Sequence, residues 1–113
     1  MISESCYFFI LGPVPAITEL LLKSNKKVAD IDNIEVNEAF ASQFLAVEKA
    51  LGLDPAKTNI HGGGIALGHP LAASGGRIMA NLIHEMHRSN LKNSIGSACI
   101  GGGQGIAVLL EKC

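Results

Sequence analysis

The stretch SIGSACIGGGQGIAVLL, residues 94–110, decides the fold class of this chain. Two short apolar segments, residues 94–99 and 106–110, flank a turn in which residues 101–105 include four glycines. Short apolar segments bounded by glycine are typical of strands, and a connection this short indicates an antiparallel pair. We therefore expect two antiparallel strands joined by a glycine turn late in the chain.

Upstream of this pair of strands, the spacing of apolar residues predicts three helices and one further strand. The helices are expected at residues 15–24, 37–51 and 75–87, and the strand at residues 34–36. Asn37 and Ser74 stand where helix N-caps are expected, and Gly52 stands where the second helix should end. The stripes expected to face the core are Phe40, Phe44, Val47 and Leu51 on the second helix, and Ile78, Leu82, Ile83 and Met86 on the third. The third stripe is broad enough for a buried central helix, and the whole pattern predicts a mixed α/β fold.

The composition indicates a folded domain and excludes several functional classes. Of the 113 residues, 48% are hydrophobic and 17% are charged, and the net charge is −1. We expect one small domain without the basic patch that marks nucleic-acid binding. The apolar residues 6–11 follow Glu4 and are cut short by two prolines, which fits neither a signal peptide nor a membrane helix. The expectation is a soluble chain with no membrane partner, in the cytoplasm or in the matrix of a mitochondrion or other organelle.

Three polar residues stand at the ends of expected elements, where reactive groups are commonly held. Asn37 is either a helix cap or an amide that fixes a water or a carbonyl. His69, between Gly68 and Pro70, is a general base, an oxyanion donor or only a hydrogen-bonding side chain. Cys99, which precedes the glycine turn, is either a reactive thiol beside free N–H groups or a small buried hydrophobe. The residues alone leave these alternatives open.

Two further patterns are weaker signals of function. Residues 101–105 contain G-x-G, but no third glycine opens a helix, so they do not form a dinucleotide-binding fingerprint. His84 and His87 lack the H-E-x-x-H spacing, and we expect them on a solvated helix face rather than around a metal. The three cysteines include no CxxC pair and predict neither a disulfide framework nor a zinc ribbon. A nucleotide-binding or metal-binding module is therefore the least favoured alternative.

Four blocks in order, at fitting intervals, resemble the thiolase family. They are LGPVPA at residues 11–16, VNEAFA at 36–41, GGGIALGHP at 62–70 and CIGGGQG at 99–105. The resemblance covers nearly the whole chain and implies a thiolase-like C-terminal domain at residues 11–113, with residues 1–10 outside it. The implied fold is a mixed sheet packed between helices, incomplete relative to the full thiolase fold.

The resemblance also implies an activity and roles for four residues. Thiolases are acyltransferases that condense or cleave 3-ketoacyl-CoA thioesters by Claisen chemistry, with coenzyme A as a substrate and no further cofactor or metal. His69 would deprotonate the nucleophilic cysteine and then hydrogen-bond a thioester oxygen, and Asn37 would hold a water that shares this oxyanion role. Cys99 would pass a proton to or from the substrate, and the Gly101 N–H would contribute to a second oxyanion hole.

Substrate binding and partners follow from the same resemblance. Ala39 and Phe40 would line the passage for the acyl and pantetheine groups. The family's acyl-accepting cysteine lies in an N-terminal half that the resemblance does not include. The implied partners are acyl-CoA, CoA and either an N-terminal thiolase half or a second copy of the chain, and we expect the chain alone to be inactive. The alternative is an inactive thiolase-like remnant that binds CoA or acts as an interaction module.

Three positions depart from the family pattern. His61 stands where many members carry Asn, Gly64 where many carry Ala, and Ala72 where many carry Gly. His61 would alter the charge of the site, and Ala72 would tighten the turn that follows His69.

Overall fold

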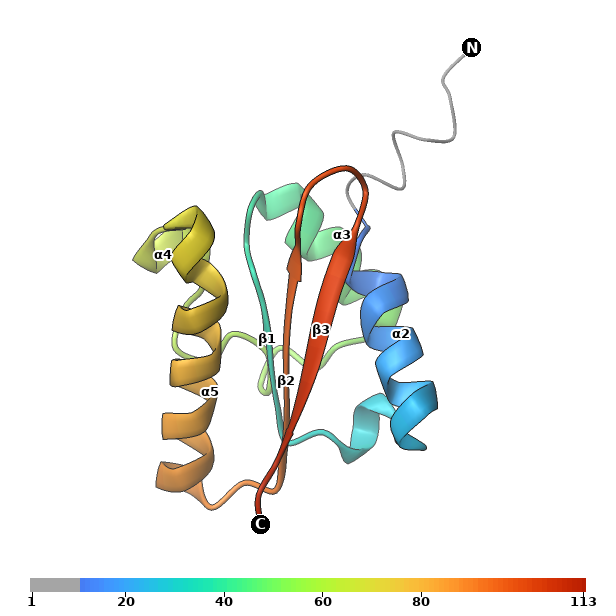
Figure 1. The fold of residues 1–113 in the computed structure, drawn as a ribbon, viewed down its shortest axis with the longest axis vertical. Coiled ribbons are helices and arrows are strands. Elements are labelled where there is room, and N and C mark those ends of the chain that lie inside the picture. The colour runs from blue at the N-terminus through green and yellow to red at the C-terminus, as the bar shows by residue number, and fades with distance from the viewer. Residues whose placement is uncertain (1–10) are drawn as a thin grey trace.

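The computed structural model describes residues 11–113. Its helices are α2 (Pro13–Ser24), α3 (Ala41–Leu51), α4 (Gly64–Leu67) and α5 (Ser74–Ser89), and its strands are β1 (Asn33–Val36), β2 (Asn93–Cys99) and β3 (Gly105–Glu111). Short 3₁₀ turns at Val28–Asp30 and Leu71–Ala73 precede β1 and α5. Helices α2 and α3 lie on one face of the sheet and α5 lies on the other, which confirms the expected α/β class (Figure 1). The expected unmatched segment, residues 1–10, lies outside the described residues.

The sheet is mixed and has the strand order β1-β2-β3. Strand β1 runs parallel to β2 and pairs Ile34 with Ile95, whereas β2 and β3 run antiparallel and pair Ile95 with Leu109. The expected antiparallel pair is therefore confirmed. Parallel strands need a long crossover, which the segment carrying α3, α4 and α5 provides. The carboxyl ends of β1 and β2 consequently meet at one edge of the sheet, which places Asn37 and Cys99 at the same end of the molecule.

Strand β1 is buried on both faces, although its sequence alternates between polar and apolar residues. Ile34 and Val36 belong to the core cluster that also contains Ile17 of α2 and Val47 of α3. The side chains on the opposite face, which lies under α5, are polar. These are Asn33, Glu35 and Asn37, each no more than 2% exposed. The strand therefore carries an apolar core on one side and a row of buried polar groups on the other.

The buried carboxylate of Glu35 is bound by two side chains of α5. Arg77 forms an ion pair with it through Nη1, and Asn81 donates from Nδ2 to Oε2 at 2.6 Å. A buried charge requires partners of this kind, because its desolvation would otherwise cost several kcal/mol. The ion pair fixes the position of α5 relative to β1. It therefore also fixes Ser74, which lies one helical turn before Arg77.

Two expected helix caps are absent, because the side chains concerned are used elsewhere. Helix α3 begins at Ala41 rather than near Asn37. The Asn37 N–H extends the sheet by donating to the Ser97 carbonyl at 2.8 Å, and the Asn37 side chain faces His69. Helix α5 begins at Ser74 itself, and the Ser74 side chain caps no N–H group of this helix. Gly52 does end α3, in the left-handed conformation at φ 61°, as expected.

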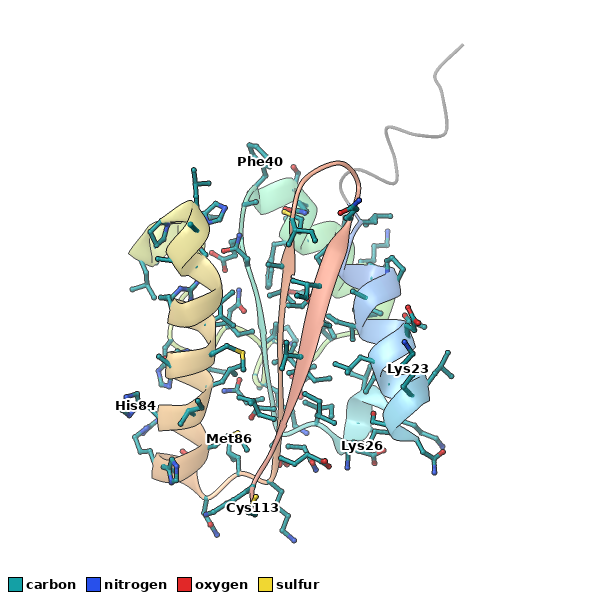
Figure 2. The ribbon with its side chains drawn as sticks, in the orientation of Figure 1. Lys23, Lys26, Phe40, His84, Met86 and Cys113 are labelled. Atoms are coloured by element: carbon teal, nitrogen blue, oxygen red, sulfur yellow. The ribbon has the colours of Figure 1, made fainter. Side chains whose placement is uncertain are left out.

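Two members of the expected apolar stripes face solvent. Phe40 is 72% exposed and Ile83 is 44% exposed, while Val47, Ile78 and Leu82 are buried as expected. Figure 2 shows Phe40 pointing away from the sheet at one end of the molecule. Only one face of α5 is covered in this chain, so the helix is not buried on all sides as the breadth of its stripe suggested. None of the helices within residues 11–113 has the length and apolar character needed to cross a membrane.

The start of α2 packs directly against the start of β3, backbone on backbone. A Cβ atom on Gly105 would overlap the carbonyl of Gly12, and a Cβ on Gly12 would overlap the carbonyl of Gln104. Glycine at both positions is therefore required by the close approach of the two backbones.

We expect Gly105→Ala to lower the free energy of unfolding by about 1–3 kcal/mol, because α2 must move away from β3 to make room. Gly76→Ala is the matched control, since a Cβ there meets no atom within 4 Å. Alanine in the helix should instead raise stability by about 0.5–1 kcal/mol. Urea unfolding of both variants measures the difference, and equal effects at the two glycines would contradict the close packing.

Candidate active site

A cavity of about 520 Å³ lies between the amino-terminal end of α5 and the carboxyl end of β2. Three predicted site residues line it: His69, Cys99 and Gly101. Asn37 lies directly behind His69, within hydrogen-bonding distance of the imidazole. Four residues separated by up to 64 positions are thus brought to one end of the molecule, as the carboxyl ends of the parallel strands require.

The His69 imidazole is held at both nitrogens. Its Nδ1 lies 2.6 Å from Ser74 Oγ, and its Nε2 lies 3.3 Å from Asn37 Nδ2. Gly68, at φ 99°, ends α4 in a conformation that favours glycine and turns the chain toward the cavity. The residue itself is exposed, whereas Ser74 and Asn37 are buried. An accessible ring held between two buried groups is suited to proton transfer.

Asn37 contributes a second feature to the site. It is 1% exposed, and its Oδ1 is buried without a hydrogen-bond partner among the described residues. A buried acceptor of this kind is unusual, because most buried polar atoms are paired. The amide can therefore bind a water or a substrate group in addition to the imidazole.

Cys99 ends β2 and is half-buried at the wall of the cavity. Its Sγ lies 3.7 Å from Oε1 of Gln43, a buried residue of α3. The sequence analysis does not predict a role for Gln43. The available signal was a polar residue one helical turn before Val47 on the apolar stripe of that helix.

The glycine turn after Cys99 adopts a conformation that other residues rarely reach. Gly101, Gly102 and Gly103 have φ values of 86°, 60° and 75°. The turn is closed by Gln104 N–H donating to the Gly101 carbonyl and by Ile100 N–H donating to the Gln104 carbonyl, both at 3.0 Å. None of the described carbonyls accepts a hydrogen bond from the Gly101 N–H, so this group can bind an oxyanion at the cavity wall.

Glu38 fixes the loop that leads to His69. Its carboxylate accepts hydrogen bonds from Asn59 Nδ2 at 2.9 Å and from the Ile65 N–H at 3.1 Å. A Cβ on Gly63 would overlap this carboxylate. The contact between Glu38 and Ile65 joins residues 27 positions apart, so sequence spacing alone does not predict it.

The two predicted substrate-binding residues do not line this cavity. Ala39 is half-buried and Phe40 is exposed, both in the segment that joins β1 to α3. Their contact with substrate stays a prediction.

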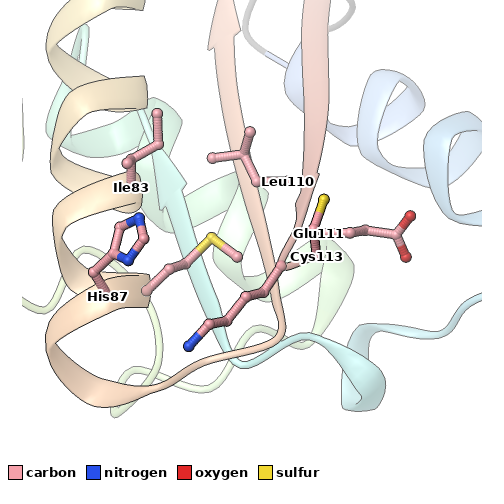
Figure 3. A pocket seen from close by; sticks show the side chains of 7 residues that line it. Ile83, His87, Leu110, Glu111 and Cys113 are labelled. Atoms are coloured by element: carbon pink, nitrogen blue, oxygen red, sulfur yellow. The ribbon is translucent and has the colours of Figure 1, made fainter.

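The other sequence signals lie away from this cavity. His84 and His87 are both exposed, as expected. His84 points away from the sheet (Figure 2), whereas His87 borders a hollow between α5 and the end of β3. Within residues 11–113, no three His, Cys, Asp or Glu side chains are grouped as metal ligands would be. A second hollow, of about 310 Å³, lies at the opposite end of the sheet between α5 and the end of β3 (Figure 3). Its walls are largely apolar and include Ile83 and Leu110.

His61, expected to alter the charge of the site, is instead paired with α5. Its Nε2 lies 2.7 Å from Oε2 of Glu85. The Glu85 carboxylate also accepts hydrogen bonds from Arg88 at Oε2 and from Ser89 at Oε1. The hydrogen bond from Ser89, followed by those with His61 and Arg88, lowers the pKa of Glu85 from 4.5 to about 2. His61 does not line the cavity that contains His69.

This lowered pKa predicts an acid-sensitive contribution to stability. Because the folded carboxylate binds its proton less readily than the unfolded one, its contribution is fully present above about pH 4.5 and is lost as the pH falls toward 2. Glu85→Gln lacks this contribution. The gap in urea midpoint between the two proteins should therefore be constant from neutral pH to about 4.5 and should close below it. A gap that is unchanged in acid would contradict the assignment.

Comparisons with known proteins give one consistent result. Residues 3–112 match the family model described as "Thiolase, C-terminal domain". The chain is 63% identical over 101 residues to the mitochondrial 3-ketoacyl-CoA thiolase of Bos taurus, covering 89% of this chain and 25% of that protein. It is 53% identical over 102 residues to the acetyl-CoA acetyltransferase of Escherichia coli strain K12, covering 90% of this chain and 26% of that protein.

A solved structure gives the same result. The human mitochondrial 3-ketoacyl-CoA thiolase in complex with CoA superposes with a TM-score of 0.91 at 57% identity, covering 93% of this chain and 27% of that chain. The chain therefore spans about a quarter of the length of the relatives that it matches.

Proposed function

Because the chain belongs to the thiolase family, through that family's C-terminal domain, we propose that it supplies the acid–base part of a thiolase active site. The proposed reaction is thiolysis or Claisen condensation of 3-ketoacyl-CoA thioesters, completed by an N-terminal thiolase half that carries the acyl-accepting cysteine. CoA and acyl-CoA are the proposed substrates, and the solved relative that holds CoA supports this choice.

One observation carries the proposal: a single cavity collects an imidazole, a thiol and a free backbone N–H, with a buried amide behind them. Each group suits one demand of the reaction. Cleavage of a 3-ketoacyl thioester needs a base for the nucleophile, an acid for the departing carbon and donors for two oxyanions.

In the proposed thiolysis, His69 takes the proton of the partner's cysteine, and the thiolate attacks the 3-keto carbonyl. The bond between the α- and β-carbons then breaks, and its electron pair forms the enolate of acetyl-CoA. His69 and a water on Asn37 stabilise the enolate oxygen, and Cys99 gives its proton to the α-carbon. Cys99, now a thiolate, then takes the proton of free CoA, whose sulfur attacks the acyl-enzyme, and the tetrahedral oxyanion lies at the Gly101 N–H. Its collapse breaks the bond to the partner's cysteine, and that cysteine regains its proton from His69. The covalent intermediate divides one difficult step into two easier ones.

The surface around the cavity supports a partner that covers it. Large apolar side chains at this end of the molecule are exposed: Phe40 (72%), Ile65 (64%), Leu67 (60%), Leu71 (77%) and Ile100 (56%). Apolar groups gathered in this way mark interaction surfaces. We propose that the N-terminal half covers this rim, excludes water from the cavity and places its cysteine near His69.

Alkylation of the thiols tests whether the site is intact. In the 113-residue chain, Cys99 should react with iodoacetamide faster than Cys113, although Cys99 is half-buried and Cys113 is exposed. The reason is that Cys99 lies at the wall of the cavity that His69 and Gly101 also line, where a neighbouring base can activate a nucleophile. Mass spectrometry of peptides after timed alkylation gives the rate at each cysteine. If Cys99 reacts no faster than Cys6 and Cys113, the inactive CoA-binding remnant becomes the better description.

A further inference from the structure

We infer that Ser74 is a positioning residue, which holds His69 in the tautomer that carries hydrogen on Nδ1 and leaves Nε2 as the acceptor nitrogen for acid–base chemistry. This inference rests on the proposed function for its consequence in the reaction. Its structural part rests on the geometry of three side chains alone.

The contact with Ser74 is short and its geometry is well defined by the fold. Ser74 Oγ lies 2.6 Å from His69 Nδ1, and Ser74 is 3% exposed. Ser74 is the first residue of α5, which the Glu35–Arg77 ion pair anchors to β1. The hydroxyl is thus presented to the imidazole by a rigid helix end. It caps no backbone N–H of α5, so it is free to serve the imidazole.

The second contact selects the tautomer. The group that faces His69 Nε2 is Nδ2 of Asn37, at 3.3 Å, and an amide nitrogen can only donate a hydrogen bond. With the amide in this orientation, His69 Nε2 is the acceptor, which places the ring hydrogen on Nδ1. A hydroxyl oxygen accepts as readily as it donates, so Ser74 Oγ can receive the Nδ1–H.

The consequence for the reaction is a histidine prepared to act as a base. When Nε2 takes the proton of a cysteine thiol, the S–H bond breaks, an N–H bond forms and both ring nitrogens carry hydrogen. The Nδ1–H still donates to Ser74 Oγ in this cationic state, so the contact with Ser74 is the same before and after Nε2 takes the proton. Without Ser74, a fraction of the neutral rings would hold their hydrogen on Nε2 and could not accept the proton.

Ring-nitrogen NMR shifts of the ¹⁵N-labelled 113-residue chain test the tautomer directly. The wild-type His69 signals, assigned by their loss in His69→Gln, should show hydrogen on Nδ1. Ser74→Ala should shift His69 toward a mixture of the two tautomers, and Ser74→Thr, which keeps the hydroxyl, should restore the wild-type pattern. The other histidines of the chain serve as internal references and should not shift.

Hydrogen on Nε2 in the wild-type chain would overturn the inference, and this outcome does not depend on whether Ser74→Ala folds. An unchanged tautomer in a folded Ser74→Ala chain would also overturn it. In a protein completed by an N-terminal half, Ser74→Ala should lower kcat/KM by roughly 10-fold, with the pH profile altered and with rescue by Ser74→Thr. Absence of thiolysis in that protein would contradict the proposed function instead, because the NMR measurement decides the tautomer without turnover.

Discussion

Replacing His69 with alanine is expected to lower the rate of thiolysis by about 10²- to 10⁴-fold, the usual contribution of a positioned acid or base. The measurement requires a complete enzyme. We suggest a chimera in which this chain replaces the segment that it matches in the Bos taurus 3-ketoacyl-CoA thiolase, where the two are 63% identical. The substrate is acetoacetyl-CoA with free CoA.

His84→Ala is the matched control, because it removes an exposed imidazole from the outer face of α5. It should leave the rate unchanged. A His69→Ala chimera that keeps most of its activity would show that the cavity lined by His69 and Cys99 is not the site of proton transfer.

The second large effect concerns stability. Arg77→Ala should lower the free energy of unfolding by about 3–5 kcal/mol, because it leaves the carboxylate of Glu35 charged, buried and without its cationic partner. Folded domains are stable by only about 5–15 kcal/mol, so much of the stability of this small chain would be lost. Urea unfolding followed by circular dichroism measures the change.

Two comparisons make this prediction specific. Lys23→Ala breaks the exposed ion pair with Glu19 and should change the free energy of unfolding far less than Arg77→Ala, because solvent screens exposed pairs. Replacing Glu35 and Arg77 together by methionine should cost less than Arg77→Ala alone, because no uncompensated charge remains. If Arg77→Ala costs no more than Lys23→Ala, the pair does not anchor α5 to β1.

The elements that the sequence predicted correctly are those determined by local signals. Apolar segments on both sides of a glycine turn defined β2 and β3, and Gly52 defined the end of α3. Helix beginnings were predicted less well, because Asn37 and Ser74 are both good N-cap residues but bond His69 instead. A side chain that has two suitable partners, one local and one distant, cannot be assigned from sequence spacing.

The polar face of β1 could not be predicted for a related reason. Alternation of polar and apolar residues usually indicates a strand with one face in water. Here the polar face lies under α5, where Glu35 is bound by Arg77 from 42 residues away. Only the tertiary structure shows that this carboxylate is buried.

The sequence predicted the residues of the candidate site but not the residues that hold them in place. Asn37, His69, Cys99 and Gly101 were all expected. The fold brings the last three to one cavity and places Asn37 behind His69. Their catalytic roles stay predictions. Gln43, Glu38 and Ser74 support these residues through contacts between segments far apart or on different elements, and no motif in the sequence marked them for that purpose.

The most direct test of the central claim is the turnover of acetoacetyl-CoA and CoA by the chimera, measured beside the 113-residue chain alone. The account predicts turnover in the chimera, loss of that turnover in its Cys99→Ser variant, and none in the chain alone. A folded chimera without turnover would contradict the claim that this domain supplies a working acid–base site. Turnover by the chain alone would contradict the claim that the acyl-accepting cysteine belongs to an N-terminal half.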